Sequence, residues 1–162
     1  MAKDMTISDK GHFKESIQKA LYKSSDIKDL LLGDTDGMSK QEIRKNFKDH
    51  VVSHLFIDDT IEKTDSFIFY DVMFPNLSPK VKNCKVLMYA ICHRDILDNY
   101  YKEGFYGNRA DILGQMIEDV LINDEKTCNS FGIGELTLDR VEIYNSHRFY
   151  GNIMTFNVPT FR

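Results

Sequence analysis

Residues 108–123 read NRADILGQMIEDVLIN, and this stretch decides the fold because it is the clearest amphipathic helix in the chain. Asn108 is a good N-cap, since its side chain can accept a hydrogen bond from the free backbone N–H groups of the first turn. Asp111 follows where the helix dipole favours an anion. A helix of this kind requires a sheet or another helix to cover its apolar stripe. That stripe is formed by residues at helical spacing: Ile112, Leu113, Met116, Ile117, Val120 and Leu121.

Three further helices are predicted in the first third of the chain. The first two have apolar residues at helical spacing, and Gly33 ends the second: Phe13, Ile17, Ala20 and Leu21, then Ile27, Leu30 and Leu31. Ser39 and Glu42 match a capping box, so a third helix begins after Ser39. Its apolar positions step by four and predict that it runs to about Leu55: Ile43, Phe47, Val51 and Leu55.

Four segments rich in β-forming residues predict strands at residues 66–74, 84–92, 135–144 and 150–158. The first two are apolar on both faces, and such strands are usually covered on one face by a helix and on the other by a second layer or chain. The order of elements predicts an α+β fold, with N-terminal helices followed by a mainly antiparallel sheet of about four strands (β-β-α-β-β) packed on the central helix. We expect a single compact domain, in which residues 1–38 form a helical extension to an α+β unit at 39–162.

The composition is that of an ordinary soluble protein. The chain has 162 residues, of which 42% are hydrophobic and 28% charged, and its net charge of −4 offers no overall attraction for nucleic acid. No apolar run approaches the ~20 residues of a membrane-spanning helix, and the polar start predicts neither a signal peptide nor a transit peptide. The three cysteines, Cys84, Cys92 and Cys128, leave at least one unpaired, which predicts a reducing compartment and synthesis in a cytoplasm.

No motif carries a complete catalytic set. His93-Arg94-Asp95 opens like a kinase catalytic loop, but Tyr100 stands where the asparagine belongs, so the motif is read as a strand end entering a turn. The cysteines form no Cys-x-x-Cys pair and are read as small buried hydrophobic residues. Gly132-Ile133-Gly134 lacks the third glycine of a nucleotide fingerprint and precedes a strand. The sequence therefore predicts no catalytic residue and no cofactor.

Two motifs suggest metal ions and are incomplete. Asp34-Thr35-Asp36-Gly37 resembles a calcium loop, but Leu32 and Ile43 stand at two of its ligand positions, so a turn is expected. His50 and His54, four residues apart on the expected helix, lack the third ligand of a zinc site. No metal is predicted.

Two surface features are candidates for contacts with partners. Lys40, Arg44 and Lys48 share one helix face and suit phosphate or an acidic partner, although such a row is usually just solvated. The stretch 98–107 is loop or short helix and contains Tyr100, Tyr101, Phe105 and Tyr106, which favours an interface or a packed loop because tyrosine tolerates both wet and dry surroundings.

Several stretches between Lys45 and Phe156 resemble the tail terminator and neck-completion proteins of long-tailed bacteriophages and phage-tail-like particles. They are HLFI at 54–57 with Asp59-Thr60, FYGNRADI at 105–112, FGIGEL at 131–136, and YGN at 150–152 with Thr155-Phe156. The resemblance covers about two-thirds of the chain and excludes residues 1–38.

The resemblance implies a structural subunit of the virion with no enzymatic activity. Copies would assemble into a cyclic homo-oligomer, typically a hexamer, that caps the tail tube and joins it to the head-side connector. The expected partners are other copies, the tail tube protein and the connector, while DNA passes through the lumen without specific binding and no membrane is involved. The expected location is the neck of the virion, and the host cytoplasm during assembly.

Contacts in a cyclic ring are heterologous, one patch against a different patch. Residues from the aromatic loop and from the turn of the last hairpin are the predicted interface: Tyr100, Tyr101, Phe105, Tyr106, Arg109, His147, Arg148 and Phe149. Three alternatives stay open: another neck or head–tail connector protein, a small intracellular enzyme using His93 or His147 with a carboxylate, and an accessory module that binds through the Lys40–Lys48 helix.

Overall fold

The computed structural model describes residues 7–55, 63–77, 82–123 and 136–158. In these residues the helices are α1 (Ile7–Lys23), α2 (Ser25–Leu32), α3 (Lys40–His50) and α4 (Arg109–Glu118). The strands are β1 (Val51–Val52), β2 (Ser66–Leu77), β3 (Lys82–His93), β4 (Thr137–Asn145) and β5 (Phe149–Val158). A 3₁₀ turn, Arg94–Ile96, follows β3, and a π-helical turn, Asp119–Asn123, prolongs α4.

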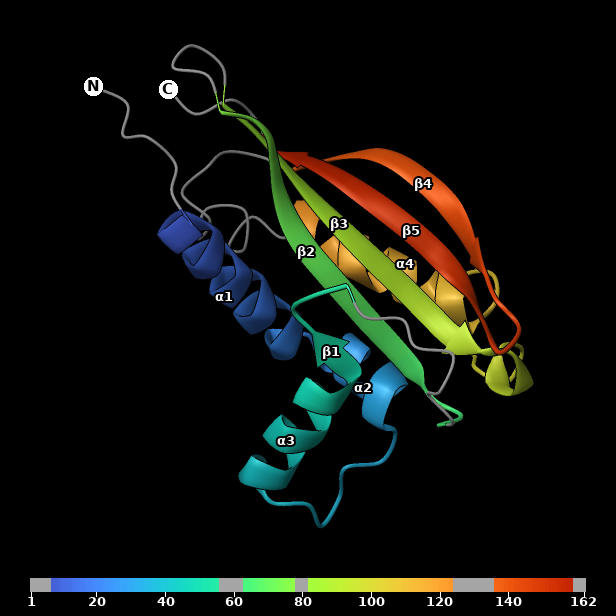
Figure 1. The fold of residues 1–162 in the computed structure, drawn as a ribbon. Helices are drawn as coiled ribbons and strands as arrows, with labels where there is room; N and C mark the ends of the chain where they lie inside the picture. The colour runs from blue at the N-terminus through green and yellow to red at the C-terminus, as the bar shows by residue number, and fades with distance from the viewer. Residues whose placement is uncertain (1–6, 56–62, 78–81, 124–135, 159–162) are drawn as a thin grey trace.

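The strands form one five-stranded sheet in the order β1-β2-β3-β5-β4 (Figure 1). Only β1 runs parallel to its neighbour, and the other pairs are antiparallel. The last strand of the chain, β5, lies between β3 and β4, so β4 stands at one edge of the sheet. The predicted α+β fold with a mainly antiparallel sheet is confirmed, and β1 adds a fifth, two-residue strand.

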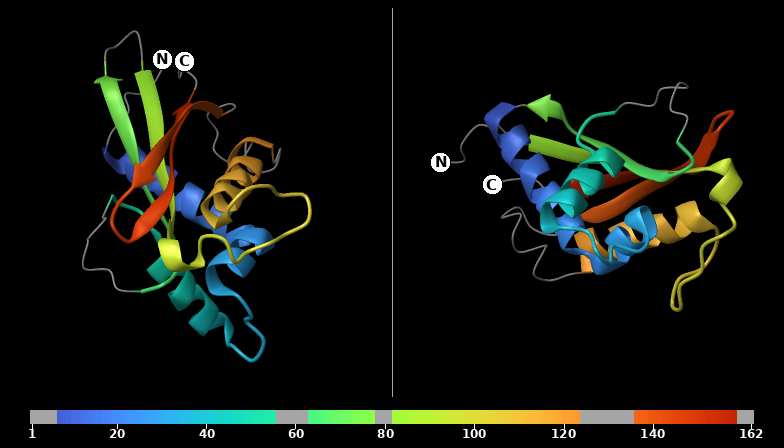
Figure 2. Two further views of the ribbon diagram at one scale, coloured as in Figure 1. Left: turned by 90° about the vertical axis from the view of Figure 1, so that its right-hand side faces the viewer. Right: turned by 90° about the horizontal axis from the view of Figure 1, so that it is seen from below.

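The helices gather on one face of the sheet, with α4 packed along β3 and β5 (Figure 2). This arrangement buries the apolar stripe predicted from residues 108–123 against alternate residues of the strands. The main core draws on every layer, including the N-terminal helices: Ile17, Leu21, Ile27, Leu30, Ile68, Tyr70, Val86, Met88, Leu113, Met116, Ile117, Met154 and Phe156.

Both predicted N-caps are present. The Ser39 and Asn108 side chains accept hydrogen bonds from the backbone N–H of Glu42 and Asp111, at 3.1 and 2.9 Å. Glu42 and Asp111 in turn accept from the cap N–H groups, which completes two capping boxes. Before α3, Asp34 accepts from the backbone N–H of Asp36 at 2.9 Å, as in the turn expected there.

The third helix is shorter than the apolar spacing predicted. It ends at His50, whereas the pattern placed its end near Leu55. Val51 adopts extended backbone and pairs with Ile68 of β2, because a β-branched residue fits a strand. The partner residue lies 17 positions further along the chain, beyond the reach of a local pattern. The four-residue spacing of apolar residues continues past the end of the helix because Val51 is also buried in the strand.

β2 also extends beyond its predicted end at Phe74 and reaches Leu77. The register against β3 shifts between Met73 and Asn76, where Pro75 cannot donate to the ladder. Several stretches noted in the sequence lie outside the described residues, among them 56–60, Cys128 and 131–135.

Candidate functional site

The aromatic loop between the 3₁₀ turn and α4 is half anchored and half exposed. Tyr100 and Phe105 pack against the main core, whereas Tyr101 and Tyr106 are 83% and 79% exposed. The Tyr100 hydroxyl donates to the Asp29 carboxylate of α2 at 2.8 Å. Burial, and then the hydrogen bond to this carboxylate, raises the pKa of Tyr100, so the hydroxyl stays a donor. The loop therefore holds Tyr100 and Phe105 against the protein and presents Tyr101 and Tyr106 to the outside.

Arg109, predicted as an interface residue, is bound mainly within the protomer. Its Nε donates to the Ser66 hydroxyl at 2.8 Å and its Nη2 donates to the Leu30 carbonyl at 2.6 Å. The guanidinium also lies 5.2 Å from the centre of the Tyr100 ring. Ser66 is only 1% exposed, so the arginine satisfies a buried hydroxyl at the start of β2. Arg109 thus ties α4, α2, β2 and the aromatic loop together.

Two further contacts fix the path of this loop. Lys102 lies 2.8 Å from the Asp26 carboxylate, and this hydrogen bond is the main reason that the pKa of the lysine is raised. Tyr106 donates its backbone N–H to the Gln115 side chain at 3.2 Å. Gly107 has a φ of 103°, and a Cβ there would lie 2.8 Å from the capping carboxylate of Asp111.

The structure brings the aromatic loop and the last hairpin turn to the same end of the sheet. Arg94, in the 3₁₀ turn that leads into the loop, donates its backbone N–H to the Arg148 carbonyl at 2.8 Å. Its Nε donates to the Ser146 carbonyl at 3.0 Å. Residues about 50 positions apart in sequence therefore form one surface, visible where β3 ends and β5 begins (Figure 1).

Within the hairpin turn the three predicted residues differ. His147 is exposed, Arg148 is half-buried, and Phe149 is only 2% exposed. The Phe149 ring meets Phe67 at 5.9 Å and His93 at 5.4 Å between ring centres. The interface role of all eight residues stays a prediction, and the side chains best placed to touch another chain are Tyr101, Tyr106 and His147.

The second face of the sheet carries no helix among the described residues, and Figure 1 looks onto it. Near β1 it holds a small buried cluster: Phe67, Phe69, Ile91 and Phe149. Further along, Leu87, Tyr89 and Ile153 are half-buried, and Met73 is 40% exposed. We call the surface formed by Met73, Leu87, Tyr89 and Ile153 the open face.

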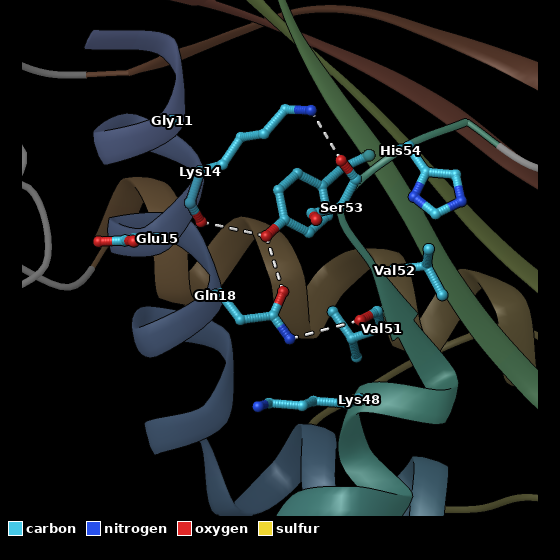
Figure 3. Close-up of a pocket in the computed structure, with 10 residues that line it drawn as sticks. Gly11, Lys14, Glu15, Gln18, Lys48, Val51, Val52, Ser53 and His54 are labelled. Carbon is cyan, nitrogen blue, oxygen red and sulfur yellow. Dashed lines mark hydrogen bonds between the residues drawn. The ribbon is translucent and has the colours of Figure 1, made fainter. Parts of the chain in front are cut away.

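A pocket of about 490 Å³ lies between α1, β1 and the end of α3 (Figure 3). The Tyr70 hydroxyl lies at its wall, 2.7 Å from the Gln18 side-chain oxygen, and Gln18 donates to the Val51 carbonyl at 3.3 Å. Lys14 donates to the Ser53 carbonyl and contacts the Asp71 carboxylate, both at 2.7 Å. These polar groups hold α1 against the sheet.

The pocket was not predicted from the sequence, because its walls come from residues 11–18 and 48–54 together with Tyr70. Burial, and then the charge of Asp71, raises the pKa of Tyr70, which keeps the hydroxyl protonated and makes it a poor base or nucleophile. For Asp71, burial raises the pKa, but hydrogen bonds from Lys14, the Val72 N–H and Lys10 outweigh it and lower the pKa overall. The polar groups around the pocket thus form hydrogen bonds and ion pairs that join α1 to the sheet.

Two of the histidines considered for catalysis or metal binding, His93 and His50, have structural partners. His93 caps the 3₁₀ turn, with Nδ1 accepting from the Asp95 backbone N–H at 3.1 Å. His50 Nδ1 lies 2.7 Å from the Asn46 carbonyl, its ring stacks on Phe67, and the end of α3 separates it from His54. The described residues contain no group of three or more His, Cys, Asp or Glu side chains that could hold a metal ion.

Cys84 and Cys92 are fully buried free thiols, as predicted. Burial raises the pKa of Cys84 to about 12 and also raises that of Cys92, so neither is a thiolate near neutral pH.

The Lys40, Arg44 and Lys48 side chains are exposed along α3. In the part of the chain that the structure covers, every helix is too short or too polar to span a bilayer.

Comparison with known proteins gives a family match. The model of the family described as YomW matches residues 15–158, which include all the described strands and α2 to α4. No curated protein and no solved structure matches this chain.

Proposed function

The chain belongs to the YomW family, which indicates a phage-associated protein, and we propose that it is a structural subunit of the phage particle. The family is named after a gene of a Bacillus prophage region. Within the particle we propose the role of tail terminator, a ring that caps the tail tube and joins it to the head connector. The resemblance of residues 45–156 to terminator and neck proteins supports this finer assignment.

The observation that carries the proposal is a group of apolar side chains that the described residues of the protomer leave partly exposed. On the open face, Leu87, Tyr89 and Ile153 are half-buried, and Tyr101 and Tyr106 stand exposed at the end of the same sheet. Partly exposed apolar residues on a sheet, and exposed tyrosines on the loop beside α2 and α4, are both typical of protein–protein interfaces. In a closed ring one patch meets a different patch, and the open face and the aromatic loop are two such patches.

In this role the protein makes and breaks no covalent bond. Its partners are other copies of itself, in a ring that is typically hexameric, the tail tube protein and a head-side connector protein. It acts in the neck of the virion and assembles there from the host cytoplasm. The net charge of −4 suits a ring through which DNA passes without adhering. Another neck or connector role would use the same ring surfaces.

A different function, binding an acidic partner, is favoured by one observation. Lys40, Arg44 and Lys48 are all exposed along α3. Phosphate binding through such a row depends strongly on salt. Retention on heparin that disappears with salt, and that Arg44→Glu abolishes in a monomeric protein, would support this function in place of the ring.

The test of the ring is the mass of the purified chain, alone and with tail tube protein, by light scattering. We expect a multiple of the 18.8 kDa protomer. Leu87→Glu puts a charge on the open face and should reduce the mass toward that of the protomer, because a charge is costly in an apolar interface. The matched control is Ile7→Glu, which charges a residue that is 80% exposed at the start of α1.

A mass equal to one protomer, with and without tail tube protein, would contradict the ring. So would a ring that Leu87→Glu and the double variant Tyr101→Ala/Tyr106→Ala both leave intact, because the proposed surfaces would then be unused.

A further inference from the structure

β4 is a long strand with an unpaired edge. Its nine residues pair with β5 on one side, and no described strand lies on the other side (Figure 1). An edge strand of this length presents a row of free backbone N–H and C=O groups that can pair with another strand.

Two large apolar side chains on β4 are exposed on the helix-bearing face of the sheet. Val141 is 54% and Ile143 68% exposed, and their partners across β5 are Met154 and Asn152. α4 covers β5 and stops short of β4, which leaves a groove of about 190 Å³ between Gly114, Glu118, Leu138 and Val141. β4 therefore extends beyond the helical layer, and no described helix covers Val141 and Ile143.

The other face of β4 carries opposite charges two residues apart. Arg140 and Glu142 form an exposed ion pair at 2.9 Å. Charged residues on an edge usually prevent pairing because like charges meet. In an antiparallel pair of two β4 strands centred on Val141, however, Arg140 of each copy lies opposite Glu142 of the other. A parallel pair in register would instead place arginine on arginine, so the charges select the antiparallel arrangement.

We propose that β4 is a two-fold contact through which two copies of this chain join their sheets edge to edge. The axis passes through the Val141 pair and stands perpendicular to the sheet. It keeps α4 of both copies on one side, so that Val141 and Ile143 of the two chains line one apolar floor between the helices. The contact is isologous, whereas ring contacts are heterologous, so it does not depend on the proposed function.

The test is a charge swap, read as the dissociation constant of self-association by sedimentation equilibrium. The wild-type chain should form particles with an even number of protomers. Arg140→Glu alone and Glu142→Arg alone should each weaken the association about tenfold or more, because like charges then face each other at two places. Mixing the two single variants should restore the wild-type constant, since each copy then meets opposite charges on its partner. The double swap R140E/E142R should restore it as well.

The control is the fold of each variant, measured by circular dichroism and by the urea midpoint, which should change little because both side chains are exposed. A wild-type chain that stays monomeric at every concentration would overturn the proposal. So would single variants that associate like the wild type, or a mixture that shows no recovery. A ring that survives both single variants would overturn this contact alone and leave the proposed ring function standing.

Discussion

The two faces of the sheet carry similar residues and have different surroundings. Along β3, Val86, Met88 and Ala90 point to the helices and are fully buried. Leu87 and Tyr89, which alternate with them, point to the open face and are half-buried. An apolar residue in a strand thus identifies a surface that needs cover. Among the described residues the helices cover one face, whereas the second face is fully buried only around Phe67, Phe69, Ile91 and Phe149. The difference supports the proposal that the open face contacts a partner.

The largest expected effect tests whether residues on the two faces contribute differently to the free energy of unfolding. Phe156→Ala removes a fully buried ring from the helix-covered face and should lower the free energy of unfolding by about 3–5 kcal/mol. Ile153→Ala, on the open face of the same strand, should cost roughly 1 kcal/mol in the monomer. Urea unfolding of both variants gives the comparison. Equal costs would mean that the open face is already covered in solution.

Gly151, on the same face of β5 as Ile153, leaves no room for a side chain. A Cβ at this residue of β5 would lie 2.1 Å from the Ala90 carbonyl oxygen, which is backbone and cannot turn away. Gly151→Ala should therefore force β3 and β5 apart and cost about 3 kcal/mol, measured by thermal unfolding. Thr155→Ala, on the same face of β5, is the matched control with an expected cost of roughly 0.5 kcal/mol. A stable Gly151→Ala variant would show that the two strands can separate without loss.

Variants of Arg109 and Arg148 test which of these two residues stabilises the protomer and which is free to contact a partner. Arg109→Met removes the donor to the buried Ser66 hydroxyl and the Leu30 carbonyl, and it should destabilise the chain by about 2 kcal/mol. Arg148→Met, at the other predicted contact, is the control and should cost roughly 0.5 kcal/mol or less. If chemical denaturation gave the reverse order, Arg109 would be free for contacts and the hairpin turn would be the anchor.

The smallest effect concerns the ion pairs of Asp71 with Lys10 and Lys14 at the edge of the sheet, 3.2 and 2.7 Å long. Since the pKa of Asp71 is lowered in the folded state, this stabilisation is complete above the unfolded pKa of about 3.9 and is lost as the pH falls through the folded value. Asp71→Asn should cost less than about 1 kcal/mol at neutral pH. The difference in urea midpoint between the wild type and Asp71→Asn should disappear in acid. A difference that stays constant with pH would exclude the ion pairs as its cause.

The sequence predicted most local features because their causes are local. The capping boxes at Ser39 and Asn108 each involve residues three positions apart, and the amphipathic stripe of residues 108–123 identifies its own buried side. The failure at the end of α3 has the same origin, because the strand partner that ends the helix at His50 is Ile68, beyond the range of any local pattern. The pocket beside α1 was missed for that reason too.

The sequence by itself determined the four helices, the four longer strands and the two capping boxes, since these depend on neighbours within a few residues. Only the tertiary structure decided which face of the sheet the helices cover, that Arg109 is an anchor reaching Leu30, and that β4 is left at the edge with Val141 and Ile143 exposed. These outcomes depend on contacts between residues distant in sequence. Such contacts form only when the whole chain has found the arrangement that buries the most apolar surface.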